Sequence, residues 1–142
     1  MMERGYINIT ENERHEFTVE AKLINGTVWL SEWQIASIFN VYTKKIEANI
    51  RSIFRLGLLN EQEVTHIRAF ENHGCKKEEV LYNLEVIIFI SFKITSFEAK
   101  AFREWIFKAF REHVWNDSND KVSNVLIVRN GNSNYPIITS LN

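Results

Sequence analysis

Two stretches with the apolar spacing of α-helices lie between Ser31 and Gly57, and only a few residues separate them. Ser31 can cap the first helix with its side-chain oxygen. Asn40 can end that helix, because asparagine tolerates a left-handed backbone. A second helix is predicted over residues 43–56, with Gly57 as its stop. The apolar positions are Trp33, Ile35, Ala36 and Phe39 in the first helix and Ile46, Ile50, Ile53 and Phe54 in the second.

The spacing of these residues predicts a helix-turn-helix, in which two helices meet at a steep angle through a short turn. Ala36 is small where the helices would cross, Asn40 supplies the turn, and Val41 is apolar where the turn must be held. Ile46 and Ile50 would then anchor the second helix in the core. Both helices are therefore expected to belong to one motif.

The outward face of the second helix is predicted to be basic. Successive helical residues are rotated by about 100°, so burial of the isoleucines turns another set to solvent: Lys44, Lys45, Ala48, Arg51, Ser52 and Arg55. We expect Lys44 and Lys45 to reach base edges in a DNA major groove, because lysine can donate to guanine acceptors. Arg51 and Arg55 are expected to contact phosphate. Glu47, near the edge of this face, opposes the cations.

Tyr42 and Thr43 stand at the start of the second helix, where backbone N–H groups are free. They are expected to bind phosphate together with those amides. Many basic helix faces are simply solvated, and that interpretation stands beside DNA binding. The spacing around Asn40 favours DNA binding over a solvated face.

Alternating apolar and polar residues predict strands ahead of the first helix. Residues 6–10 form a short candidate strand, and residues 17–24 form a clearer one. Asn25-Gly26 then separates residues 17–24 from residues 27–30, and this dipeptide is typical of a two-residue hairpin turn. An N-terminal β-hairpin formed by these last two segments is expected.

Two short strands joined by a loop near residues 72–77 are expected between residues 58 and 82. Two interpretations of this segment remain open. It is either the wing of a winged helix, with Arg68, Lys76 and Lys77 on DNA phosphate, or an ordinary charged loop.

Asn83 is predicted to cap a short apolar helix that ends near Ile90 and is buried in the core. Thr95 and Glu98 fit a capping box, with threonine at the cap and glutamate three residues later. They predict a long amphipathic helix that ends near Val114. The apolar stripe of this helix is Phe102, Trp105, Ile106, Ala109 and Phe110.

Phe107 and Trp115 fall outside that stripe. They form a partner surface, or another element covers them. Residues 116–142 are rich in Asn and Ser, and they form either a weak hairpin or a disordered tail.

The residues that carry chemistry form no recognisable catalytic or metal site. His66, His73 and Cys75 are the one metal-like cluster, and a structural zinc site needs four ligands. Cys75 lacks an identifiable base, and the five glycines form no phosphate loop. We therefore expect no enzyme activity, no cofactor, no metal and no small-molecule substrate.

Composition gives little sign of a partner. The formal net charge is −1, so any positive electrostatic potential that attracts DNA has to come from a local cluster of cations. A single cysteine gives no internal disulfide. The longest apolar stretch, residues 84–92, is far shorter than the roughly 20 residues of a membrane span. A cytoplasmic protein without a leader or membrane anchor is expected.

Several motifs resemble those of the RhuM-like virulence-associated family of bacteria and phages. They are Val28-Trp29-Leu30-Ser31 with Gln34, Ile35, Ala36 and Phe39; Ile46 and Ile50-Arg51-Ser52-Ile53-Phe54 with Gly57-Leu58-Leu59; Tyr82-Asn83-Leu84-Glu85-Val86-Ile87-Ile88; and Phe102-Arg103-Glu104-Trp105. The resemblance covers about residues 27–114 and implies DNA binding. Asn40 departs from the family's usual glycine, residues 71–77 are shorter than its pattern, and the tail after Trp115 has no counterpart.

The sequence thus predicts an α+β protein. Residues 1–115 are expected to form a helix-turn-helix or winged-helix DNA-binding domain, followed by the tail of residues 116–142. The expected function is sequence-specific binding of double-stranded DNA through helix 43–56. The family resemblance implies a role in the regulation of transcription or of a mobile element. A homodimer is expected, because such proteins commonly pair to span two half-sites. The alternative is a protein–protein interaction module on the same fold.

Overall fold

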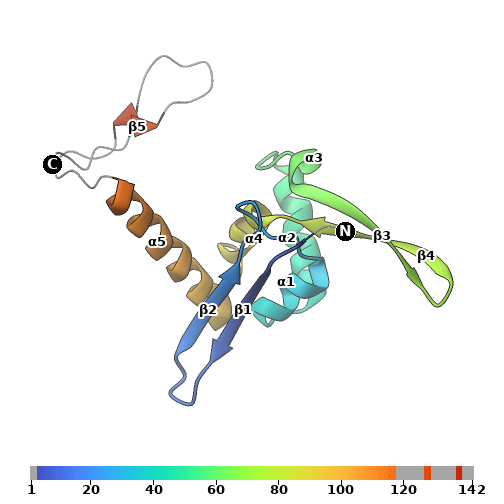
Figure 1. Cartoon of the computed structure of the whole chain (residues 1–142), viewed down its shortest axis with the longest axis horizontal. Coiled ribbons are helices and arrows are strands. Elements are labelled where there is room, and N and C mark those ends of the chain that lie inside the picture. The colour runs from blue at the N-terminus through green and yellow to red at the C-terminus, as the bar shows by residue number, and fades with distance from the viewer. Residues whose placement is uncertain (1–2, 118–126, 129–136, 139–142) are drawn as a thin grey trace. The chain divides into compact units, whose positions relative to one another are not determined.

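The computed structural model describes residues 3–117, 127–128 and 137–138. Its contacts divide the chain into two compact units, Met1–Trp105 and Ile106–Asn142. The elements, in order, are β1 (Tyr6–Glu11), β2 (Phe17–Lys22), α1 (Glu32–Phe39), α2 (Thr43–Arg55), α3 (Glu61–Val64), β3 (Thr65–Asn72), β4 (Cys75–Tyr82), α4 (Leu84–Ser91), α5 (Phe97–Asp117), β5 (Ile127–Val128) and β6 (Ile137–Ile138) (Figure 1). This arrangement confirms the α+β class: an N-terminal hairpin, helices, a second hairpin and a long C-terminal helix.

The N-terminal hairpin exists, but its pairing differs from the expected one. β2 pairs antiparallel with β1, from Tyr6 opposite Lys22 to Glu11 opposite Phe17. The Asn25-Gly26 turn forms as predicted, with positive φ at both residues. However, the segments on its two sides pair only through a single bridge between Ile24 and Thr27, and not as two strands of a hairpin. The alternating pattern shows that a strand is half-buried and does not say which neighbour it pairs with.

The start and the end of α1 are as predicted. Ser31 Oγ accepts the N–H of Gln34 at 3.2 Å, and the Gln34 side chain accepts the N–H of Ser31 at 3.0 Å. Asn40 has φ 55° and ψ 50°, and the N–H of Val41 donates to the Ala36 carbonyl at 3.0 Å. Trp33 was wrongly assigned to the apolar face, since it is 69% exposed. It is the second residue of the helix and lies on the solvent side.

The apolar side of α2 also follows the prediction. Ile46, Ile50 and Ile53 are buried, and Phe54 is half-buried against the ring of Tyr82. After the helix, Gly57 adopts φ 70° and reverses the chain.

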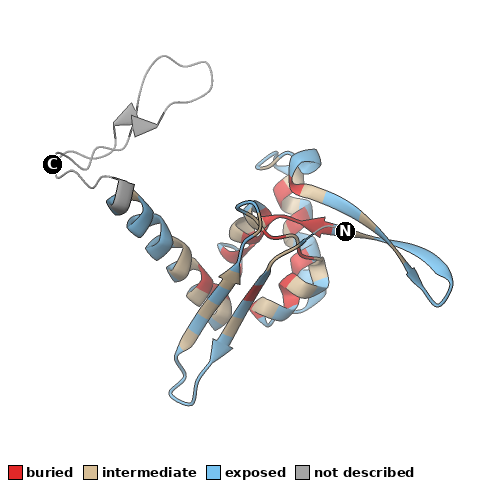
Figure 2. Cartoon of the chain, in the orientation of Figure 1, coloured by how far each residue is buried: buried red, intermediate tan, exposed pale blue. Residues whose placement is uncertain are grey.

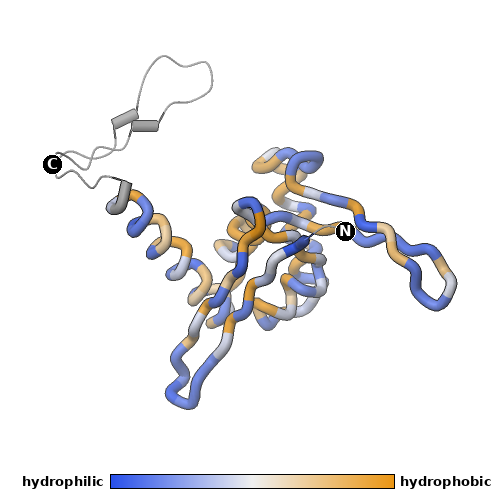
Figure 3. The backbone as a smooth tube through the Cα atoms, in the orientation of Figure 1, coloured by the Kyte–Doolittle hydropathy of each residue, from blue (hydrophilic) through white to orange (hydrophobic). Residues whose placement is uncertain are grey.

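The second hairpin consists of two eight-residue strands, β3 and β4, joined by a tight turn at His73 and Gly74. It extends away from α1 and α2, and its end is mostly hydrophilic (Figures 1 and 3). The N–H of Leu30 donates to the Tyr82 carbonyl at 2.9 Å, and the N–H of Tyr82 donates back at 2.8 Å. The segment that precedes α1 is thereby joined to the base of β4.

The core of the first unit gathers under α1, α2 and α4 (Figure 2). Asn83 caps α4 as predicted, since its Oδ1 accepts the N–H of Val86 at 3.3 Å. The cap of α5 is Ser96 and not Thr95, because Ser96 Oγ accepts the N–H of Ala99 at 3.1 Å. The helix starts one residue later than the capping-box pattern placed it.

The apolar stripe of α5 is buried only near its start. Phe102 is fully buried, whereas Phe110 is 56% exposed and Ala109 is exposed too. In the second unit, β5 pairs with β6, which is the pairing of the hairpin interpretation of the tail. Residues 116 and 117 of the expected tail belong to α5, and residues 118–126, 129–136 and 139–142 lie outside those described. Among the described residues, no helix is long and apolar enough to cross a membrane.

Asn40 gives a direct test of the turn between α1 and α2. Asn40→Gly should leave the free energy of unfolding unchanged or slightly higher, because glycine adopts positive φ without strain. Asn40→Val should lower it by about 1–2 kcal/mol, because a β-branched residue is strained in the left-handed region. Urea denaturation measures both. Equal stability of the two variants would contradict the role given to this residue.

Candidate nucleic-acid interface

Burial of the three isoleucines decides which residues of α2 meet solvent. Tyr42, Thr43, Lys44, Lys45, Ala48, Arg51 and Arg55 are exposed, and Ser52 is half-buried. Tyr42 is the extreme case, with 88% of its surface open to solvent. The structure therefore brings the predicted DNA-contacting residues together on the outer side of one helix.

Four of these residues form a line along the helix axis. Lys44, Ala48, Arg51 and Arg55 are spaced by four, three and four positions, which places them above one another on a helix. Lys45 and Ser52 flank this line on one side, and Glu47 flanks it on the other. The small Ala48 leaves a gap between cations, so a surface could approach the backbone there.

Positive charge is strongest at the start of α2. No acidic residue lies in its first turn, and the Tyr42 side chain makes no capping hydrogen bond among the described residues. Free amides and the helix dipole add to Lys44 and Lys45. Within the described part of the chain, no carboxylate is within 4.0 Å of the Lys44, Lys45 or Arg55 nitrogens. These three cations remain available to an outside anion.

Arg51 differs from the other cations of α2. Its guanidinium donates to Glu47 Oε1 at 2.8 Å, one turn earlier in the helix. The two side chains are 66% and 50% exposed. Glu47 was predicted only to oppose the cations, although its i, i+4 spacing from Arg51 is typical of an ion pair.

The flank of α2 that carries Glu47 is acidic. The Tyr82 hydroxyl donates to Glu32 Oε1 at 3.3 Å. Burial and the nearby charges of Glu32, Glu61 and Glu47 raise the pKa of Tyr82 far above its ordinary value. One carboxylate therefore bonds this hydroxyl and two more act on it electrostatically, so the surroundings of Tyr82 are acidic and disfavour phosphate.

The hairpin β3–β4 holds the three cations proposed for a wing. Arg68 lies opposite Glu79, and its Nε is 2.8 Å from Glu79 Oε1. Its guanidinium also stands 5.2 Å from the centroid of the Phe70 ring. Lys76 and Lys77 are exposed near the turn. Arg68 is thus engaged within the hairpin, whereas the two lysines are open to solvent.

Glu79 connects this hairpin to the N-terminal segment. Arg4 lies 3.8 Å from Glu79, donates through Nε to the Trp29 carbonyl at 3.0 Å, and also donates to the Gln34 side chain. Burial lowers the pKa of Arg4, and the carboxylate of Glu79 opposes that shift. These links hold the hairpin base against the start of α1, and sequence reasoning did not find them.

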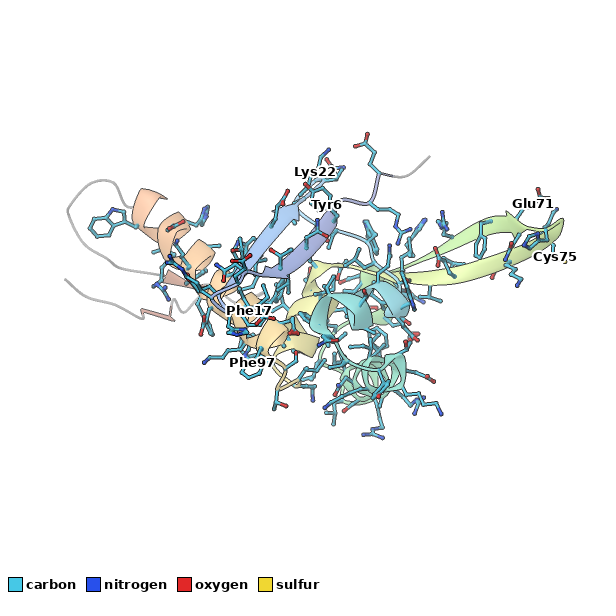
Figure 4. The ribbon with its side chains drawn as sticks, turned by 90° about the horizontal axis from the view of Figure 1, so that it is seen from below. Tyr6, Phe17, Lys22, Glu71, Cys75 and Phe97 are labelled. Atoms are coloured by element: carbon cyan, nitrogen blue, oxygen red, sulfur yellow. The ribbon has the colours of Figure 1, made fainter. Side chains whose placement is uncertain are left out.

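The remaining predicted residues lie elsewhere. His66 packs against Trp29 near the base of the hairpin, while Cys75 is exposed at its end, where Figure 4 labels it with Glu71. Among the described residues, no group of three His, Cys, Asp or Glu side chains could hold a metal ion. Phe107 and Trp115 on α5 are 48% and 69% exposed.

No family model matches the chain, and comparisons with curated proteins and with solved structures give no match either.

Glu79→Ala tests the ionic link at the hairpin base. It leaves Arg4 and Arg68 without the carboxylate between them, so the free energy of unfolding should fall by about 1 kcal/mol, less in high salt. Urea denaturation at two salt concentrations measures this. Glu78→Ala is the control, because Glu78 is exposed on the other side of the hairpin. The same stability in both variants would count against the link.

Proposed function

We propose that this protein binds double-stranded DNA in a sequence-specific manner through α2, as a regulator of transcription or of a mobile element. The observation that carries the proposal is the exposed line of Lys44, Arg51 and Arg55, with Lys45 beside it, on a helix whose opposite side is buried. A helix of this kind can enter a major groove, with its N-terminal residues on base edges. Tyr42 and Thr43 would contact phosphate beside the free amides.

The local structure around Asn40 supports a helix-turn-helix. Ala36 is buried, its carbonyl accepts the N–H of Val41, and α2 starts at Thr43 after a three-residue turn. A short turn with a left-handed residue sets α2 at an angle to α1, so the start of α2 can project from the domain. The resemblance to the RhuM-like family points the same way.

The bridge between Leu30 and Tyr82 favours the winged form of the motif. Leu30, which precedes α1, pairs with the last residue of β4 in the hairpin that follows α2. The segment before α1, the two helices and the hairpin are therefore joined, as in a winged helix. In this form Lys76 and Lys77 would reach phosphate from the hairpin. Arg68 would instead stabilise the hairpin through Glu79.

Protein interaction is the second candidate function, because Phe107 and Trp115 are large and exposed. A second copy of the chain is the partner we propose, since two copies would present two α2 helices to two half-sites. A salt-dependent shift with mixed genomic DNA supports the first function. A retained protein partner, with no DNA shift at low salt, supports the second.

The double variant Lys44→Ala, Lys45→Ala tests the DNA-binding surface. We expect its affinity for a duplex selected from a random pool to fall at least about tenfold, because base-edge contacts are lost. Its melting temperature should barely change, because both side chains are exposed. Fluorescence anisotropy and thermal denaturation measure the two effects.

The matched control is Lys93→Ala with Lys100→Ala, which removes the same charge from exposed positions outside α2. Its affinity should stay close to that of the native protein. An equal loss of affinity in both double variants would mean that affinity depends on the net charge of the protein and not on the α2 surface. Unchanged affinity in the α2 variant would rule this surface out.

A further inference from the structure

We infer that Glu47 and Arg51 act as one unit that reads a guanine and a cytosine, which makes Glu47 a specificity-determining residue of α2. The inference rests on the proposed DNA-binding function and adds the chemistry of the bases that this surface would recognise. It also changes the role of Arg51, which the sequence assigned to phosphate.

The ion pair places an acceptor and a donor side by side on the solvent side of the helix. The Arg51 nitrogen and Glu47 Oε1 are 2.8 Å apart, and both side chains keep at least half of their surface exposed. A carboxylate has about four acceptor positions, and a guanidinium has five N–H donors. One hydrogen bond between them leaves most of this capacity free for an outside partner.

A phosphate is a poor partner for this unit. The pair has no net charge, so Arg51 does not offer an outside phosphate an unopposed cation. Phosphate binding depends on unopposed cations, which the described structure provides at Lys44, Lys45 and Arg55.

A base pair in the major groove is a suitable partner. Guanine presents two acceptors that match an arginine fork, and cytosine presents an amino group that donates to a carboxylate. Neighbouring base pairs are about 3.4 Å apart, so two side chains that contact each other directly can face the same base pair or adjacent ones. The unit therefore fits one C·G pair or two adjacent ones.

The exposed ion pair alone gives no reason for an acidic residue on this face. An exposed i, i+4 pair contributes little to stability, and Glu47 cancels the charge that Arg51 would otherwise offer. On a surface that only attracted phosphate, this arrangement would weaken binding. On a surface that reads bases, the same carboxylate rejects bases without an amino group.

The test is selection from a random duplex pool with the native protein, Glu47→Gln and Glu63→Gln. Glu63→Gln is the control, because it removes the same charge from an exposed position on α3. The native consensus should contain a C·G pair that Glu47→Gln no longer prefers, with discrimination reduced about tenfold or more. Glutamine forms two hydrogen bonds with adenine, so the consensus of Glu47→Gln should contain an A·T pair in place of that C·G pair. Glu63→Gln should select the native consensus.

Each other outcome overturns something definite. If Glu47→Gln selects the native consensus, and binds all duplexes more tightly to the same degree as Glu63→Gln, the inference is wrong and the proposed function stands. If the native protein binds no duplex at low salt, the proposed function fails and the inference fails with it. Circular dichroism of each variant checks that its helical content equals that of the native protein.

Discussion

Burial of Ile46, Ile50 and Ile53 is the constraint from which the rest of the interface follows. Each buried isoleucine contributes about 2 kcal/mol. A turn of α2 by one residue, about 100°, would exchange them for charged neighbours such as Glu47, and burial of an unpaired charge is far more costly than the loss of one methyl group. The helix therefore has one orientation, and its cations face solvent because its isoleucines do not. The turn at Asn40 then sets where this helix starts relative to α1.

Sequence reasoning succeeded where the atoms that interact are close along the chain. The caps at Ser31 and Asn83 use hydrogen bonds that span three residues, and the turn at Asn40 depends on one backbone conformation. The isoleucine stripe of α2 is also local, because helical spacing alone aligns it. These local features are sufficient to predict the candidate DNA surface without any tertiary contact. The cap of α5 at Ser96 shows the limit, since two adjacent hydroxyl residues offer nearly equal caps.

Pairings between distant segments could not be read from the sequence. β2 was assigned to the wrong neighbour, because alternation marks a buried face and is silent about the partner. The bridge from Leu30 to Tyr82 joins residues that no local pattern relates. The same holds for the link from Arg4 through Glu79, whose members are single charges in unrelated segments. These long-range contacts decide how the hairpin stands against α1, and only the folded structure supplies them.

The near-neutral net charge of the chain is compatible with a DNA-binding surface because charges act locally in salt. At physiological ionic strength the screening length is about 8 Å, so a duplex against α2 responds mainly to the side chains that touch it. In a DNA complex of the proposed kind, the carboxylates that act on Tyr82 would complement the cationic line, because they would disfavour phosphate near them. Such an arrangement would lower affinity for DNA in general and would restrict the orientation of a bound duplex. Specificity depends on the ratio of specific to non-specific affinity, and a mixed surface of this kind raises that ratio more than a uniformly basic helix would.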